Sequence, residues 1–184
     1  LLQVIMTRVG RNVDTPTGEK IVQLIINQFQ QHQCVTEQGL IAYQGCCMGL
    51  RERVPVREIG QYIFEALKQE EDEDVTRVAV GLVIDIADGL KEQIDQYLSS
   101  FIPSLLQILR SGKRKQDTKL MAINALASIS CYAAESFCRF YLTESLTILQ
   151  QAAAVSVQEA EFVNDPDTLQ YLGDLRAALI EAYC

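Results

Sequence analysis

Residues Val75 to Leu90 read VTRVAVGLVIDIADGL, and this apolar stretch decides how the chain folds. Val75, Val78, Leu82 and Ile86 recur three or four residues apart, which is the period of an α-helix. Further apolar residues fill a neighbouring face, so the predicted helix packs against partners on two sides. The stretch is long for a strand, and Gly89 suits the end of a helix.

A second stretch repeats this pattern about forty residues earlier. Residues Val35 to Leu50 read VTEQGLIAYQGCCMGL, with the same Val-Thr at the start and the same Gly-Leu at the end. Self-similarity at a period of about forty residues is typical of helical repeat proteins. The two stretches are therefore predicted to form equivalent helices in neighbouring repeats.

The same periodicity predicts helices along the whole chain. We expect them over residues 1–12, 19–33, 35–50, 55–69, 74–90, 94–111, 117–134, 136–155 and 167–184. Pro103 lies inside the sixth, where the loss of a backbone hydrogen bond bends a helix. Long amphipathic helices alternate with more apolar ones, and each pair spans about forty to fifty residues. The predicted fold is all-α: a single HEAT-repeat α-solenoid, a right-handed superhelix of about four antiparallel helix pairs, cut from a longer array.

Composition and charge limit the function classes. Hydrophobic residues make up 48% of the 184 and charged residues 22%, which is too apolar for a disordered chain. The net charge of −8 repels nucleic acids and favours basic protein partners, so we expect no direct contact with nucleic acid. Much of the acidity lies in residues 70–74, EEDED, which we interpret as a solvated turn that stabilises the start of the next helix, although a basic ligand could use it.

No apolar run approaches the twenty residues of a membrane-spanning helix, so we expect no membrane insertion.

Residues for catalysis or cofactor binding are absent from the pattern. The single histidine, His32, allows neither a histidine-based triad nor a multi-histidine metal site. No glycine-rich phosphate-binding loop occurs, and the six cysteines show no C-x-x-C spacing. We therefore expect no enzymatic activity, no cofactor and no metal ion.

Several segments, taken in order, resemble the importin β (karyopherin β) family of nuclear transport receptors. The segments are 79–83 (AVGLV) followed by Asp85, 101–106 (FIPSLL), 141–142 (YL), 149–152 (LQQA), 171–172 (YL), 175–176 (LR) and 181–183 (EAY). The first is similar to an inner helix of the late-central repeats of that family, and the second to the proline-bearing outer helix that follows. The resemblance is firmest from Val75 to the C-terminus.

This resemblance implies a nuclear import receptor fragment. Such proteins bind cargo directly or through the basic segment of an importin α adaptor. They also bind Phe-Gly nucleoporins on their outer helices and Ran-GTP on their concave side. The implied location is the cytoplasm, the nucleus and the nuclear pore or envelope. This chain lacks tryptophan, which family members use to hold the basic segment. The alternative is a HEAT scaffold of another class, such as a phosphatase scaffold subunit or a vesicle-coat component.

Two candidate surfaces follow. Carboxylates on the inner helices would pair with the Lys or Arg side chains of a partner, and the candidates are Asp85, Asp88, Asp174 and Glu181. The alternative for Asp85 is a structural one, in which it caps or braces a neighbouring helix. Leucines between the outer helices would hold a nucleoporin phenylalanine, with Leu106, Leu109, Leu146 and Leu149 as candidates. The alternative for each leucine is packing in the core.

Overall fold

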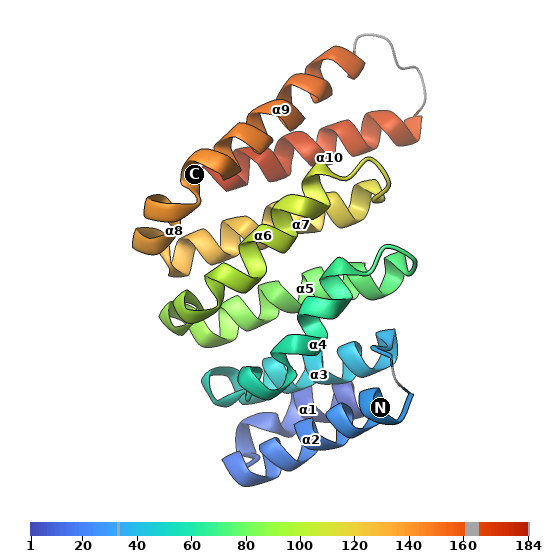
Figure 1. Cartoon of the computed structure of the whole chain (residues 1–184), viewed down its shortest axis with the longest axis vertical. Helices are drawn as coiled ribbons and strands as arrows, with labels where there is room; N and C mark the ends of the chain where they lie inside the picture. Colours follow the sequence, from blue (N-terminus) through green and yellow to red (C-terminus); the bar gives the residue numbers. More distant parts are fainter. Residues whose placement is uncertain (33, 161–165, 184) are drawn as a thin grey trace.

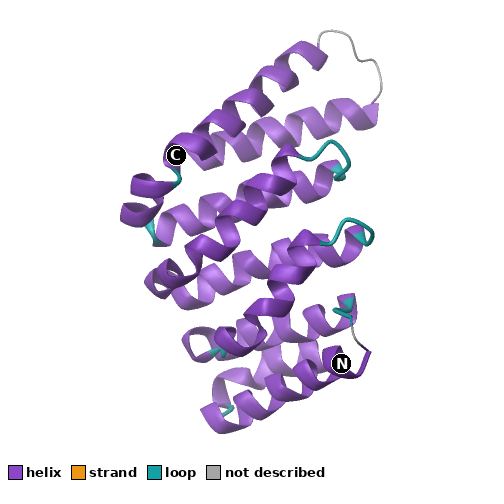
Figure 2. Cartoon of the chain, viewed as in Figure 1, coloured by secondary structure: helices purple, strands orange, loops and turns teal. Residues whose placement is uncertain are grey.

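The computed structural model describes residues 1–32, 34–160 and 166–183, and in this part the chain is a ladder of helices without strands (Figures 1 and 2). The α-helices are α1 (Leu2–Val9), α2 (Thr15–His32), α3 (Glu37–Leu50), α4 (Val56–Lys68), α5 (Glu73–Leu90), α6 (Leu98–Arg110), α7 (Gln116–Tyr132), α8 (Ala134–Phe140), α9 (Leu142–Ala160) and α10 (Pro166–Tyr183). Three 3-10 helices, η1 (Gly10–Asn12), η2 (Arg51–Arg53) and η3 (Lys91–Tyr97), follow α1, α3 and α5.

The helices form two layers. The outer layer contains α2, α4, α6 and α9, and each is followed by its antiparallel partner in the inner layer, α3, α5, α7 and α10 (Figure 1). Helix α1 lies against α3 and extends the inner layer by one helix. Inner helices pack closely against their inner neighbours, whereas outer helices touch one another more sparsely. The inner layer is therefore the concave wall, and the predicted all-α solenoid of about four helix pairs is confirmed.

The two stretches with matching sequence occupy equivalent positions. Helices α3 and α5 pack side by side in the inner layer, and both end after a Gly-Leu pair. The next residues, Arg51 and Lys91, have nearly equal φ angles of 52° and 50°. These angles lie in the region that favours glycine, so each repeat holds a strained residue where its inner helix ends.

The starts of these helices differ. Thr36 caps α3 by accepting a hydrogen bond from the backbone of Gly39 at 3.2 Å. Helix α5 begins one turn earlier in the repeat, because Asp72 is its cap and accepts hydrogen bonds from the backbone of Asp74 and Val75 at 3.1 Å. Thr76 consequently lies inside the helix and is fully buried. This arrangement agrees with the expected role of the acidic turn in starting α5.

The core runs continuously between the two layers. Its largest fully buried side chains come from successive helix pairs and include Phe29, Tyr43, Ile59, Leu82 and Phe101. A second, smaller cluster joins α7, α9 and α10. Each pair thus buries its apolar face against the next pair, and the shared seams supply most of the stabilisation by the hydrophobic effect.

Glycines permit the tightest approach in the inner layer. A Cβ at Gly49 would lie 2.3 Å from the carbonyl oxygen of Met6 and 2.9 Å from the Cα of Gly10. A Cβ at Gly45 would lie 2.5 Å from the Cα of Gln3. Helices α1 and α3 therefore contact each other backbone to backbone.

Two predicted helices are each two elements. Residues 94–111 are expected to be one helix, but η3 reaches Tyr97 before α6 begins, because the turn at Lys91 redirects the chain and Ile94 is buried within the tighter turns. Residues 136–155 are likewise split into α8 and α9 at Tyr141, where the backbone leaves the helical conformation. The Tyr141 ring packs near the rings of Phe137 and Phe140, with centroids 6.5 and 6.4 Å away. Smaller differences are that α1 ends at Val9 rather than at residue 12, and that α2 begins at Thr15 rather than at residue 19.

Candidate functional site

A groove of about 640 Å³ crosses the concave wall near the ends of four inner helices, α1, α3, α5 and α7. Its lining residues come from these helices and from η1 and η2, and are Thr7, Arg8, Arg11, Cys47, Met48, Arg51, Asp85, Asp88, Gly89 and Tyr132. Two of the four predicted inner carboxylates, Asp85 and Asp88, are therefore in one groove. The groove also carries positive charge, which was not predicted from the sequence.

Asp85 braces neighbouring helices as well as lining the groove. Gln44 Nε2 donates a hydrogen bond to Asp85 Oδ2 at 2.7 Å, and Gln3 Nε2 donates to Gln44 Oε1 at 3.3 Å. These bonds join α1, α3 and α5 in a polar ladder with a step of 41 residues. Burial raises the pKa of the Asp85 carboxyl above its usual value, the Gln44 hydrogen bond opposes this, and the charge of Asp88 adds to it. The structural alternative for Asp85, a brace between helices, is therefore present in the structure.

Asp88 is the exposed carboxylate of the groove. It lies one turn after Asp85 on α5, and it faces Tyr132 of the next inner helix. The negative charge of Asp88 raises the pKa of the Tyr132 hydroxyl. An exposed carboxylate beside an aromatic side chain suits a basic partner, because it accepts charge-assisted hydrogen bonds while the ring offers an apolar face.

The other two predicted carboxylates are not part of this groove. Asp174 is exposed on α10 and accepts a hydrogen bond from Gln170 Nε2 at 3.0 Å. Helix α7 separates α10 from α5, so Asp174 belongs to a different part of the inner wall. Glu181 falls within α10, but its side chain lies outside the described residues. The structure therefore brings together one pair of the four candidates.

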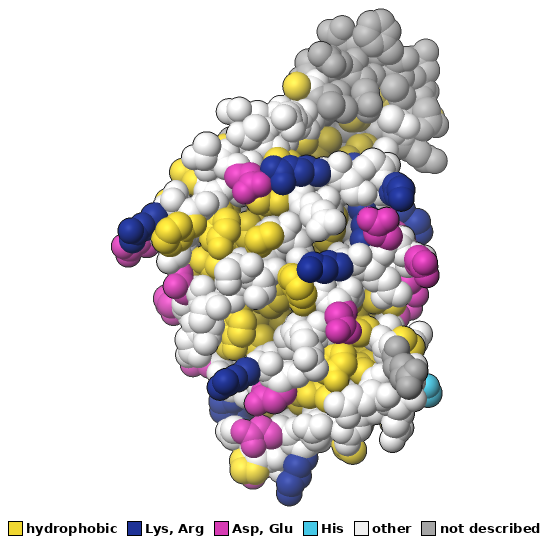
Figure 3. Space-filling view, viewed as in Figure 1, with side chains coloured by type: hydrophobic (Ala, Val, Ile, Leu, Met, Phe, Trp, Pro, Cys, Tyr) yellow, Lys and Arg dark blue, Asp and Glu magenta, His cyan; other side chains and the backbone are white. Residues whose placement is uncertain are grey.

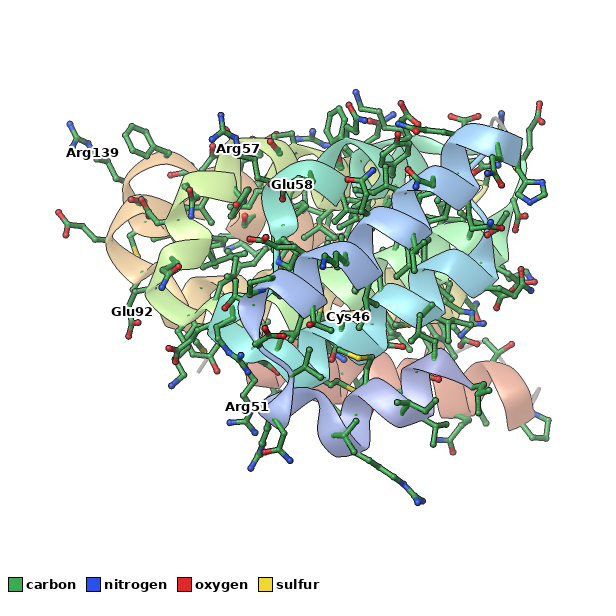
Figure 4. The ribbon with its side chains drawn as sticks, turned by 90° about the horizontal axis from the view of Figure 1, so that it is seen from below. Cys46, Arg51, Arg57, Glu58, Glu92 and Arg139 are labelled. Atoms are coloured by element: carbon green, nitrogen blue, oxygen red, sulfur yellow. The ribbon has the colours of Figure 1, made fainter. Side chains whose placement is uncertain are left out.

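Three arginines also line the groove: Arg8 and Arg11 lie on α1 and η1, which α3 separates from α5, and Arg51 directly follows α3. Arg8, Arg11 and Arg51 are all exposed, and none forms an ion pair within the described ranges. Figure 4 shows Arg51 at the lower, inner side of the molecule, where α1 also lies. In the sequence these arginines are ordinary helix-terminal residues, and only the stacking of α1 on α3 brings them together.

The acidic turn before α5 binds a basic loop of the same chain. Arg114 is buried, and it donates to Glu73 Oε2 at 3.2 Å, to Thr76 Oγ1 at 3.1 Å and to the carbonyl oxygen of Gln69 at 2.6 Å. Lys113 pairs with Glu70 at 3.4 Å. Partial burial works to raise the pKa of Glu73, but hydrogen bonds and the charge of Arg114 hold it below its usual value. Residues 70–74 thus clamp one helix pair to the next.

The four leucines of the predicted groove between outer helices differ in their exposure. Leu106 and Leu149 are 1% and 4% exposed and pack in the core, whereas Leu109 and Leu146 are half-buried. Apolar surface is visible along the outer layer in Figure 3. A cleft of about 510 Å³ opens between the third and fourth helix pairs, and Leu109 and Leu149 line it together with Tyr171. A Phe-Gly groove therefore stays a prediction, carried by the two half-buried leucines.

The cysteines and the long helices show no other site in the described part of the chain. Cys34, Cys46, Cys47, Cys131 and Cys138 are free thiols, and burial raises the pKa of Cys46 to about 11. Within the described ranges, no group of three or more His, Cys, Asp or Glu side chains is placed to hold a metal ion. No single described helix is long and apolar enough to span a bilayer; the bent pair α7 and α8 meets that test by length and composition alone.

The sequence of this chain is similar to those of known proteins. A sequence profile for the family described as "Importin subunit beta-1-like, TPR repeats" matches residues 1–184. The chain is 28% identical over 189 residues to importin subunit beta-1 of Schizosaccharomyces pombe, which covers 100% of the chain and 21% of that relative. It is 28% identical over 126 residues to importin subunit beta-1 of Arabidopsis thaliana, which covers 68% of the chain and 14% of that relative.

Solved structures agree on the fold. A crystal structure of importin beta in an ammonium sulfate condition superposes with a TM-score of 0.86 at 23% identity, over 98% of this chain and 21% of that chain. A second, in a polyethylene glycol condition, gives 0.81 at 22% identity, over 98% of this chain and 22% of the other. The chain thus spans about a fifth of the length of the proteins it matches.

Proposed function

The chain belongs to the importin subunit beta-1-like family, and from this premise we propose that it is part of a nuclear import receptor that works by reversible protein–protein contacts and performs no reaction. The family profile covers the whole chain, which favours this function over a phosphatase scaffold or a vesicle-coat component. The observation that carries the proposal is the groove on the concave wall, because it crosses several inner helices and holds exposed charge. A receptor of this kind moves between the cytoplasm and the nucleus through the nuclear pore.

The inner groove is the proposed site for a basic partner segment, either of an importin α adaptor or of a cargo protein. Asp88 is exposed and available for Lys or Arg, and Asp85 supplies a second carboxylate one turn away. Ran-GTP, bound to the same concave wall, would compete with that segment. Exposed charge pairs are weak one by one, so binding depends on several contacts along the wall.

The outer layer is the proposed site for Phe-Gly nucleoporins. Leu109 and Leu146, on α6 and α9, keep part of their side chains accessible, and these two helices contact each other. A phenylalanine ring placed between them would remove apolar surface from water, at about 25 cal/mol per Å² buried. Many such weak contacts suit a receptor that must pass quickly through a pore.

A pull-down tests the transport function. Immobilised Phe-Gly repeats should retain the chain more strongly than Ser-Gly repeats of the same length. The double variant Leu109→Ser/Leu146→Ser should reduce retention several-fold, while Leu24→Ser, at a leucine 64% exposed on α2, should not. Circular dichroism checks that each variant is folded. Equal retention of the wild-type chain on both matrices would contradict the assignment.

A further inference from the structure

We propose that the inner groove recognises a dipolar segment of a partner protein, with acidic side chains against Arg8, Arg11 and Arg51 and basic side chains against Asp85 and Asp88. This inference rests on the proposed function, and it specifies the partner of the same groove. An acidic wall alone would select any Lys-rich or Arg-rich segment. A groove with two poles of opposite sign selects the order of charges along the segment.

The positive pole is open to a ligand. Arg8, Arg11 and Arg51 line the groove and are exposed, and they have no carboxylate partner in the described part of the chain. Three other arginines, Arg77, Arg110 and Arg114, do pair with a carboxylate. A cluster of unpaired guanidinium groups in a chain of net charge −8 makes a local positive potential. Guanidinium groups bind carboxylates through two parallel hydrogen bonds, so acidic side chains are the matching ligands.

The negative pole lies on α5, which α3 separates from the α1 helix of Arg8. Asp88 is exposed beside Tyr132, and Asp85 is fixed on α5 by the hydrogen bond from Gln44. In the described structure no ion pair joins these carboxylates to the three arginines. Cys47 and Met48 of α3 line the groove between α1, which carries Arg8, and α5, which carries the two carboxylates. The two charges are therefore held apart instead of neutralising each other.

The backbone fixes the position of Arg51. Arg51 has a φ of 52° at the position where α3 ends. The main chain of Gly89 packs against that of Arg51, since a Cβ added to Gly89 would lie 3.6 Å from Arg51 Cα. The equivalent residue of the next repeat, Lys91, instead pairs with Glu52 at 3.7 Å. Of these two equivalent basic residues, only Arg51 faces the groove without an ion-pair partner among the described residues.

Specificity follows from repulsion as much as from attraction. A segment that carries only basic residues places some of them near the arginines, and a segment that carries only acidic residues places some near Asp85 and Asp88. A segment with acidic residues at one end and basic residues at the other satisfies both poles. A segment of the same composition with alternating charges matches neither pole.

The test uses methionine methyl NMR, because Met48 reports on the groove itself. The sequence contains three methionines: Met6 is buried, Met48 is 45% exposed in the groove, and Met121 lies near Gly81, outside the groove. The probes are capped peptides of sequence EEAAKK, EKAAEK and KKAAKK. We expect EEAAKK to shift the Met48 methyl signal saturably and to bind about fivefold more tightly than EKAAEK, with the Met121 signal unchanged.

Charge variants separate the two poles. Arg51→Glu should remove the preference for EEAAKK over EKAAEK and strengthen binding of KKAAKK. The control Arg57→Glu changes an exposed arginine on α4 at the opposite, outer side of the molecule and should change nothing (Figure 4). Equal binding of EEAAKK and EKAAEK, or no binding of either, would overturn the proposal, as would an unchanged preference in Arg51→Glu. Retention on Phe-Gly repeats is measured separately, so the proposed transport function can stand when this inference falls.

Discussion

Gln44 Nε2 on α3 donates a hydrogen bond to the carboxylate of Asp85 on α5 at 2.7 Å. Asp85 therefore lines the proposed binding groove and also joins two helices of the concave wall. The same Gln44 accepts a hydrogen bond from Gln3, which extends the connection to α1. Polar contacts of this kind fix the register of neighbouring repeats, whereas apolar seams supply cohesion without fixing register so strictly. The shape of the groove therefore depends on the ladder beneath it.

Removing the centre of that ladder should loosen the inner layer. Gln44→Ala leaves the half-buried Asp85 carboxylate without its donor, and we expect it to lower the free energy of unfolding by about 2 kcal/mol. Urea unfolding followed by circular dichroism measures this loss. The control is Gln23→Ala, which removes an exposed hydrogen bond to Asn27 on α2 and should cost well under about 1 kcal/mol. Equal losses in both variants would argue against the ladder.

The raised pKa of Asp85 predicts how stability changes with pH. A carboxyl with a raised pKa in the folded state favours folding when protonated, and this contribution is lost as the pH rises through the folded-state value. Asp85→Asn keeps an oxygen acceptor for Gln44 but cannot ionise. We expect this variant to unfold at a higher urea concentration than the wild type at neutral pH, with the difference closing toward the usual Asp pKa of 3.8. A variant less stable than the wild type at neutral pH would contradict this account.

Glu73 should behave with the opposite sign. Its pKa is lowered in the folded state, so its contribution is present above the unfolded-state value and is lost as the pH falls through the folded-state value. Glu73→Gln should therefore destabilise the protein at neutral pH, and the difference should shrink in acid. Urea unfolding at a series of pH values measures both variants in one experiment. A loss of stability that is constant over that range would mean that the Glu73 charge has no role.

The Arg114 clamp should dominate the electrostatic stability. Arg114→Met removes the buried guanidinium that donates to the Glu73 carboxylate and to the Gln69 carbonyl, and we expect a loss of about 3 kcal/mol. Arg114→Lys should restore little, because an ammonium group cannot reach three acceptors in fixed directions. The control is Arg110→Met, which breaks an exposed pair with Glu144 at 2.7 Å and should cost less than about 1 kcal/mol. Thermal unfolding that ranks the two methionine variants equally would be inconsistent with a clamp.

Two glycine substitutions should change stability in opposite directions. Gly49→Ala places a methyl group 2.3 Å from the Met6 carbonyl oxygen, so α1 must move away from α3, and we expect a loss of about 2 kcal/mol. Gly60→Ala on α4 meets nothing within 4 Å and should gain up to about 1 kcal/mol, because alanine favours the helix. Differential scanning calorimetry measures both. If Gly49→Ala is as stable as the wild type, the close approach of these backbones is not required.

The periodicity was enough to predict the solenoid and its register. Apolar residues at helical spacing locate the inner helices, and the Gly-Leu pairs before Arg51 and Lys91 mark equivalent ends, which the equal φ angles of these two residues confirm. The matching Val-Thr pairs were misleading about helix starts. Thr36 is a cap and Thr76 is buried, because Asp72 offers the better capping side chain one turn earlier.

Contacts between repeats could not be predicted from the sequence. Glu73 and Arg114 lie 41 residues apart, and the acidic turn and the basic loop each read as solvated segments when taken alone. The three arginines and the two carboxylates of the groove come from different repeats in the same way. Spacing along one helix predicts which side chains share a face, but the sharing of a groove depends on how the helix pairs stack.

The central claim is that the concave wall recognises a basic partner through Asp85 and Asp88. Calorimetric titration of the chain with a basic importin α-type segment, at salt concentrations from about 0.05 to 0.3 M, tests it most directly. The account predicts a Kd that rises about tenfold over this range, and a weaker, less salt-dependent Kd for Asp88→Asn. A Kd that is indifferent both to salt and to Asp88→Asn would contradict it.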